Sequence, residues 1–174
     1  MRMNKTEYGG SGGAFTVGGK EHIAELLAEP ARRNKLSRIA HCYLRSSADV
    51  CDALQETAYR AVKSAGSLKN EEYFDTWLVR ILINCCKDIL KDNSRRAAIN
   101  EKMYTAEEIS SNGDGDVFRA LRELDEKYRS VMVLFYVEGY DVKEISAMLR
   151  VPQGTVKSRL SRGREKLKTI IENA

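Results

Sequence analysis

A basic amphipathic stretch near the end of the chain, Pro152 to Ile171, constrains the fold most strongly. It reads PQGTVKSRLSRGREKLKTII, and five apolar residues recur there at helical spacing, with Gly163 on the same stripe: Val156, Leu160, Leu167, Ile170 and Ile171. The opposite face carries Lys157, Ser158, Ser161 and Arg162. From residue 150 to 168 there are seven Lys or Arg and one acid. Such a helix suits a DNA groove, although a solvated surface helix has the same pattern.

The residues just before this stretch favour the DNA interpretation. Asp141, with Glu144 three residues on, forms a capping-box pattern that predicts a short helix over Val142 to Leu149. A tight turn, Arg150-Val151-Pro152, then leads into the basic helix. A short helix, a three-residue turn and a longer basic helix make the helix-turn-helix layout, whose second helix enters the major groove. Two further helices are expected, over 118–124 and 126–137, with Gly139 just past the end of the second.

The composition bounds the class of protein. A hydrophobic content of 43% with 31% charged residues describes a core-forming chain, and only two prolines favour a mainly helical fold. The net charge of +4 is too small to indicate a polyanion partner, so the local clustering of charge matters more. No apolar run approaches the roughly 18 residues of a membrane span, and the N-terminus lacks a secretory core. We therefore expect no membrane insertion and a cytoplasmic location.

The first half of the chain predicts its own set of amphipathic helices. An apolar repeat begins near Glu21, is interrupted or re-initiated at Pro30 and continues to Leu44. Ser46-Ser47 can cap a helix over 48–64. A third helix is expected from about Glu71 to Lys91, with an apolar side of Phe74, Leu78, Ile81, Leu82, Cys85 and Ile89.

That third helix carries a polar, cationic stripe nearly opposite its apolar side. Arg80, Asn84, Lys87 and Lys91 follow one another at spacings of four, three and four, and Tyr73 and Thr76 extend the stripe. Trp77 lies at the boundary between the two sides. Cations beside aromatic rings suit a nucleic-acid strand. The alternative is an ordinary solvated face, with Trp77 simply in the core.

Two segments have little apolar periodicity. Residues 1–20 hold six of the twelve glycines and predict a flexible arm. Residues 93–117 change from basic NSRR to acidic, glycine-rich SNGDGD, which predicts a linker with a short helix near 99–104. The expected fold is therefore all-α: two small helical domains, 21–96 and 118–174, joined by a flexible linker at 97–117, the second domain being the helix-turn-helix.

Two segments resemble the bacterial sigma-70 family in its small extracytoplasmic-function (ECF) form. DALQETAYRAVKS followed by FDTWLVRILINCCKDIL is similar to the second conserved region of that family. YRSVMVLFYVEGYDVKEISAMLRVPQGTVKSRLSRGREKL is similar to the fourth region, for which GTVKSRL-x-R-x-R-x-KL is characteristic. Together the segments cover roughly residues 36–96 and 118–171, in the order and separation of the family.

The resemblance implies a promoter-specificity subunit that binds core RNA polymerase and directs transcription initiation. Asp52, Gln55 and Glu56 would dock on the clamp helices of the large subunit, and the flap is a second expected contact; without the resemblance, this face reads as solvated. The loop Leu68, Lys69, Asn70 and Glu71 would receive a flipped-out base of the −10 element. Residues along the third helix would hold the opened strand: Tyr73, Trp77, Arg80, Asn84, Lys87 and Lys91.

The same resemblance places the last helix in the major groove of the −35 element. The matching contact positions are Thr155, Lys157, Ser158, Ser161 and Arg162. An anti-sigma factor is a further expected partner. Arg150 departs from the family pattern, because that turn position usually holds Gly, Asn or Asp, and a positive φ there would cost Arg about 1 kcal/mol. Ser161 replaces an often bulkier residue, and the loop LKNEE carries two adjacent acids.

Other functions explain less of the chain. A stand-alone helix-turn-helix regulator accounts for residues 118–171 but not for the cationic helix of the first half. An enzyme is disfavoured, because the sequence has no phosphate loop, metal-ligand cluster or nucleophile–base pattern, and its only histidines are His22 and His41. The four cysteines, Cys42, Cys51, Cys85 and Cys86, are expected to be reduced and at least partly buried. Zinc on His41 and Cys42 is a minor alternative; we expect no metal or cofactor.

Overall fold

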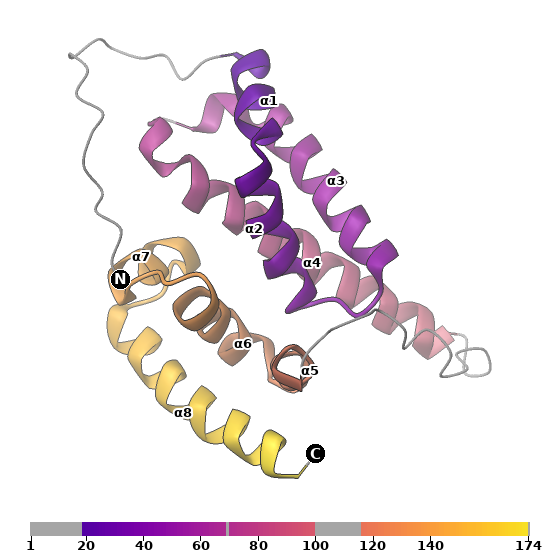
Figure 1. Ribbon diagram of the computed structural model, residues 1–174, viewed down its shortest axis with the longest axis vertical. Coiled ribbons are helices and arrows are strands. Elements are labelled where there is room, and N and C mark those ends of the chain that lie inside the picture. The colour runs from indigo at the N-terminus through magenta and orange to yellow at the C-terminus, as the bar shows by residue number, and fades with distance from the viewer. Residues whose placement is uncertain (1–18, 69, 100–115, 174) are drawn as a thin grey trace.

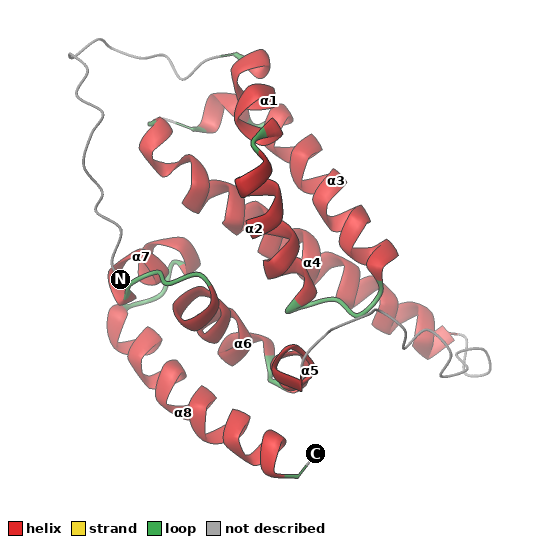
Figure 2. Ribbon diagram, in the orientation of Figure 1, coloured by secondary structure: helices red, strands yellow, loops and turns green. Residues whose placement is uncertain are grey.

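The computed structural model describes residues 19–68, 70–99 and 116–173, and within these ranges all regular structure is helical (Figures 1 and 2). This confirms the all-α prediction. Most of the predicted arm and most of the predicted linker lie outside the described residues; Lys20, the last residue assigned to the arm, instead begins α1. The first block contains α1 (Lys20–Ala28), α2 (Pro30–His41), α3 (Ser47–Lys63) and α4 (Phe74–Ile99). The second contains α5 (Asp116–Glu123), α6 (Glu126–Met132) with a π-helical turn (Val133–Val137), α7 (Val142–Leu149) and α8 (Gln153–Glu172).

Local sequence signals set the helix boundaries in the first block. Pro30 occupies the first turn of α2, where its missing N–H leaves no helical hydrogen bond unmade. The Ser46 hydroxyl accepts hydrogen bonds from the backbone N–H groups of Ala48 and Asp49 at the start of α3. Two short 3₁₀ turns, Ala65–Ser67 and Glu71–Tyr73, then connect α3 to α4.

Helix α4 extends beyond its predicted end at Lys91 and continues to Ile99. The polar run after Lys91 contains no proline or glycine, so nothing in it stops a helix. The Asn93 amide also donates a hydrogen bond of 3.0 Å to the Asp49 carboxylate of α3, and this contact holds the extension against the bundle. The basic NSRR segment is therefore helical rather than part of the linker.

The second block forms the predicted helix-turn-helix. Asp141 and Glu144 make both hydrogen bonds of the capping box at the start of α7. Gly139, past the π-helical turn, has the positive φ of 72° that its position predicts. Arg150 ends α7 in the left-handed region, at φ 54°, so this turn carries the expected backbone cost.

Helix α8 packs its apolar stripe against α6, but less completely than predicted. Val156, Leu160 and Gly163 are buried, and a Cβ added at Gly163 would lie 3.0 Å from the Met132 Cγ. The prediction that Ile171 faces inward is wrong, because this side chain is 50% exposed at the end of the helix. It lies in a groove that Val117 and Leu121 of α5 also line.

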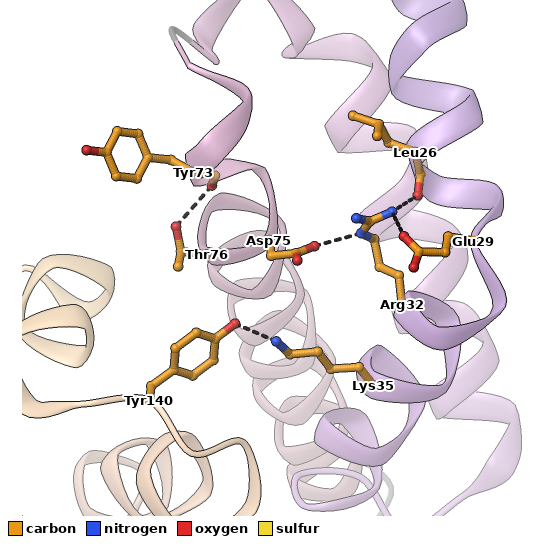
Figure 3. A network of polar contacts seen from close by, with 8 residues as sticks. All are labelled: Leu26, Glu29, Arg32, Lys35, Tyr73, Asp75, Thr76 and Tyr140. Carbon is orange, nitrogen blue, oxygen red and sulfur yellow. Dashed lines mark hydrogen bonds and ion pairs between the residues drawn. The ribbon is translucent and has the colours of Figure 1, made fainter. Parts of the chain in front are cut away.

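The two blocks pack against each other (Figure 1). The buried Tyr43 hydroxyl, after α2, donates a 3.0 Å hydrogen bond to the Ser130 hydroxyl of α6. Arg38 of α2 binds both carboxylate oxygens of Glu138, at 3.0 and 3.2 Å. Lys35 donates a 2.7 Å hydrogen bond to the Tyr140 hydroxyl (Figure 3). Burial raises the pKa of Tyr43, so its hydroxyl stays protonated and remains a donor.

The packing of the two blocks against each other, called the closed arrangement below, buries a second side of α4. Helix α4 contacts α3, α2 and α7. Its buried residues therefore include Val79, Ile83 and Cys86 in addition to the predicted Leu78, Leu82 and Cys85. Burial raises the pKa of the Cys86 thiol to about 12, which keeps it protonated. The cysteine prediction holds for the burial of Cys42, Cys85 and Cys86 but is wrong for Cys51, which is exposed.

Candidate nucleic-acid interface

The outward face of α8 presents the predicted duplex-contact residues on the outer edge of the second block (Figure 1). Lys157, Ser158 and Arg162 are exposed, and Thr155 and Ser161 are half-buried. The Ser158 hydroxyl donates a 3.0 Å hydrogen bond to the Thr155 carbonyl, which holds it against the helix. The structure therefore brings all five residues onto one helix face that the first block leaves open.

Helix α7 fixes the angle at which α8 projects. The Ser146 hydroxyl donates a 2.6 Å hydrogen bond to the Val151 carbonyl in the turn, and this bond holds the turn. Ile145 and Met148 are buried behind it. A recognition helix supported in this way reaches the groove with a defined orientation.

The predicted strand-binding residues lie along α4, but the second block covers the middle of their stripe. Asn84 and Lys91 are exposed, whereas Trp77, Arg80 and Lys87 are half-buried. The Lys87 ammonium lies 2.7 Å from the Glu126 carboxylate at the start of α6. Partial burial, and then the nearby Arg150 guanidinium, lower the pKa of Arg80. In this arrangement a nucleic-acid strand cannot run freely along the stripe.

The predicted base-binding loop leads from α3 into α4. Leu68 is only 6% exposed, so its side chain anchors the loop in the core. The Asn70 side-chain oxygen, Oδ1, accepts a 3.0 Å hydrogen bond from the Glu72 backbone N–H. The Glu71 carboxylate lies 3.1 Å from the His22 Nε2 of α1. Tyr73 is 60% exposed beside it, and Lys69 lies outside the described residues.

A cluster around Arg32 positions the start of α4, and the sequence analysis missed it. The Arg32 guanidinium binds the carboxylates of Asp75 and Glu29, each at 2.7 Å, and the Leu26 carbonyl (Figure 3). It also lies over the Phe74 ring, 4.9 Å from the centroid. These contacts fix the turn that carries Tyr73 and Thr76. Glu29 is a local i, i+3 partner of Arg32, but no local pattern indicates the Asp75 contact, because Asp75 lies 43 residues from Arg32 in the chain.

A third surface is an acidic groove of about 520 Å³ between α3 and α4. It contains all three predicted polymerase-contact residues, Asp52, Gln55 and Glu56, together with Asp88 and Asp92. Arg60 lies within it and binds Glu56 at 2.6 Å and Asp88 at 2.8 Å. These two carboxylates raise the pKa of Arg60 further. Even with Arg60 the groove has three more acids than bases, so it suits a basic partner surface.

An apolar groove of about 630 Å³ lies on the second block, and sequence reasoning missed this too. Its apolar lining comes from α5, α6 with its π-helical turn, and the end of α8: Val117, Leu121, Met132, Tyr136, Val137, Leu167 and Ile171. Tyr136 and Ile171 are each about half exposed there. Large apolar side chains left open in one groove mark an interaction surface.

Comparison with known proteins shows the family to which the chain belongs. Residues 31–96 match the model of sigma-70 region 2, and residues 115–167 match that of sigma-70 region 4. The chain is 32% identical over 161 residues to the ECF RNA polymerase sigma factor SigM of Mycobacterium tuberculosis, covering 91% of this chain and 82% of that protein. The chain belongs to the ECF sigma factors. It is also 28% identical to the ECF sigma-E factor of Escherichia coli K12, over 80% and 82% of the two chains.

Two solved structures share the fold of this sigma factor. One is the sigma factor RpoE in complex with the anti-sigma factor NepR from Bartonella quintana, with a TM-score of 0.69 and 22% identity over 88% of this chain and 98% of that one. The other is CnrH in complex with the cytosolic domain of CnrY, with a TM-score of 0.67 and 24% identity over 90% and 91%. Both matches span the two helical blocks.

As an ECF sigma factor, the protein binds core RNA polymerase and promoter DNA and directs transcription initiation. Members of this family are initiation factors. Among the helices of the described ranges, none is both long and apolar enough to span a membrane.

Proposed function

We propose that residues 21–96 bind the −10 element and the polymerase clamp, that residues 118–174 bind the −35 element, and that 97–117 link them. The observation that carries this proposal is that one chain presents two cationic helix faces, on α4 and α8, separated by a segment long enough for independent placement. The sigma factor itself catalyses nothing in this scheme; it selects the promoter in the cytoplasm and leaves RNA synthesis to the polymerase.

The two faces divide the work by the form of DNA that each suits. Helix α8 is long, exposed and basic, which fits the major groove of a duplex. The α4 stripe combines Asn84 and Arg80 with Tyr73 and Trp77, and cations beside aromatic rings suit an unpaired strand. The exposed residues of the adjoining loop, Asn70 and Glu71, are our candidates for reading a base that leaves the stack.

The polymerase contacts divide in the same way. We assign the acidic groove of Asp52, Gln55 and Glu56 to the clamp helices, because its excess of carboxylates requires a basic partner surface. We assign the apolar groove of Tyr136 and Ile171 to the flap, because the second block must also be held on the enzyme and this is where it leaves large apolar side chains open.

The closed arrangement also supports a regulatory proposal. Lys87 is paired with Glu126, and Arg80 faces Arg150, so the blocks must separate before a strand can run along α4. One of the two similar structures is a complex with the anti-sigma factor NepR, and the other is a complex with the cytosolic domain of CnrY. We propose that an anti-sigma factor also binds this protein in the closed arrangement. Such a partner should bind the free sigma factor and be displaced by core polymerase; a candidate that binds without reducing transcription would not be that partner.

The division of labour predicts different defects for two alanine variants. Asn84→Ala should change base preference within the −10 element by about tenfold, because a lost base contact costs about 1–3 kcal/mol. Arg162→Ala should instead weaken binding to −35 duplex about tenfold with little change at −10. Transcription by the reconstituted holoenzyme from promoters randomised at either element measures both effects. If both variants select the same promoters as the wild type, these site assignments are wrong.

A further inference from the structure

A small cavity of about 190 Å³ lies where the two blocks meet, between α4 and the turn of the helix-turn-helix. From α4 it is lined by Arg80, Ile83, Asn84 and Lys87, and from the second block by Met148, Leu149 and Arg150. The three charged side chains are all cations, and no lining residue is acidic. The cavity exists only while the blocks are closed, because each block supplies half of its wall.

The positive charge in this cavity is only partly balanced. Lys87 has Glu126 at 2.7 Å on the rim. Among the described residues, no carboxylate forms an ion pair with Arg80 or Arg150, and the two guanidinium groups repel each other, which contributes to the lowered pKa of Arg80. Arg80 is half-buried and Arg150 is exposed, and bringing these like charges together opposes the packing of the two blocks. A bound anion would offset this repulsion.

Arg150 also has an unusual backbone conformation, in the left-handed region at φ 54°, where glycine or asparagine would be less strained by about 1 kcal/mol. This cost belongs to the turn of the helix-turn-helix and does not depend on how the two blocks pack. What the packing of the blocks adds is a second cation, Arg80, in the wall of the same cavity.

We propose that this cavity binds a small phosphate anion, such as pyrophosphate or the terminal phosphates of a nucleotide, between Arg80 and Arg150. The guanidinium groups present planar pairs of N–H donors that match phosphate oxygens, and the Asn84 amide and the Lys87 ammonium add donors beside them. The volume equals about six waters at ~30 Å³ each, enough for one or two phosphate groups and too little for a folded peptide.

A bound anion has a consequence that rests on the proposed function. Because its contacts come from both blocks, it stabilises the arrangement in which Arg80 and Asn84 face the helix-turn-helix turn rather than DNA. The anion and a −10 strand then compete for the same side chains. Phosphate metabolites at sufficient concentration would hold the free sigma factor closed.

The binding test uses the full-length protein without polymerase or DNA. Calorimetric titration with pyrophosphate at constant ionic strength should show saturable binding. Sulfate, titrated at the same ionic strength, should bind more weakly. Arg150→Asn should weaken pyrophosphate binding at least tenfold while folding normally, because asparagine tolerates the left-handed region. Arg45→Gln, after α2, removes one exposed cation away from the cavity and from both proposed DNA-binding faces, and should bind like the wild type. Equal binding by Arg150→Asn and the wild type, or no saturable binding, would overturn the proposal.

Two further arms identify the source of the phosphate and the consequence of binding. Titration with a nucleoside triphosphate tests whether the terminal phosphates of a nucleotide enter the cavity. If the triphosphate binds more tightly than pyrophosphate, the site is assigned to nucleotides; if it binds more weakly, the site is assigned to the inorganic anion. Pyrophosphate should reduce binding of a single-stranded −10 oligonucleotide in the wild type several-fold more than in Arg150→Asn. If pyrophosphate binds but leaves strand binding by the wild type unchanged, the site stands and the assignment of α4 to the −10 strand fails; equal competition in both proteins would overturn the consequence proposed for this cavity.

Discussion

A single charge reversal at Asp52 is expected to weaken binding of the sigma factor to core RNA polymerase about thirtyfold, or roughly 2 kcal/mol. Asp52 is exposed in the acidic groove between α3 and α4, and none of the ion pairs found there involves its carboxylate. Arginine at this position would turn an attraction for a basic clamp surface into a like-charge contact. The measurement is the Kd of the full chain for core polymerase and for an isolated clamp-helix fragment.

Two variants control for this result. Glu21→Arg makes the same charge change on α1, which contributes nothing to the acidic groove, and should bind within about twofold of the wild type. Ile171→Asp, in the apolar groove, should bind the clamp fragment normally but lose affinity for an isolated flap fragment. If Asp52→Arg and Glu21→Arg bind core polymerase equally well, the acidic groove is not the clamp contact.

The largest effect on stability is expected at Arg129, where replacement by methionine should cost about 3 kcal/mol or more of unfolding free energy. This guanidinium is only 8% exposed and donates hydrogen bonds to the carbonyls at the end of α5: Leu121 at 2.9 Å, Arg122 at 2.5 Å and Leu124 at 2.8 Å. It also lies 5.5 Å from the centre of the Tyr43 ring in the first block. Methionine fills similar space but removes the donor of all three bonds; the Leu121 carbonyl keeps only a 3.3 Å bond from the Leu124 N–H.

Urea unfolding of the full chain measures this loss. Arg164→Met is the matched control, because that exposed guanidinium makes one hydrogen bond, of 3.1 Å to the Tyr136 hydroxyl, and should change stability by no more than about 0.5 kcal/mol. Arg129→Lys should recover only part of the loss, since one ammonium cannot reach all three carbonyls. Equal midpoints for Arg129→Met and Arg164→Met would show that the buried guanidinium does not hold the end of α5.

Local patterns were sufficient to predict the helices. The Ser46 cap, the Asp141–Glu144 capping box and the positive φ of Gly139 all involve residues within a few positions of one another, and sequence spacing reports such contacts directly. The outward face of α8 was also predictable, because a helix covered on one side follows a simple 3.6-residue period. The left-handed turn at Arg150 follows from its place in the helix-turn-helix.

Contacts between distant segments could not be predicted in this way. Val79 and Ile83 are buried because the second block covers α4, and nothing within α4 distinguishes that cover from solvent. Arg32 and Arg129 look like surface cations in sequence, yet each binds groups that only the tertiary fold brings near. The period also fails at the end of α8, where Ile171 falls on the apolar stripe but is half exposed. The cavity of Arg80 and Arg150 could not be predicted for the same reason, because it forms only where the two blocks pack together.

The most direct test of the account is transcription from a promoter library with purified sigma factor and core polymerase, with start sites mapped. We predict a single class of start sites that share a −10 and a −35 element at fixed spacing, present only when both proteins are added. Asn84→Ala should alter the first element and Arg162→Ala the second. Start sites that are the same with and without the sigma factor would contradict the account.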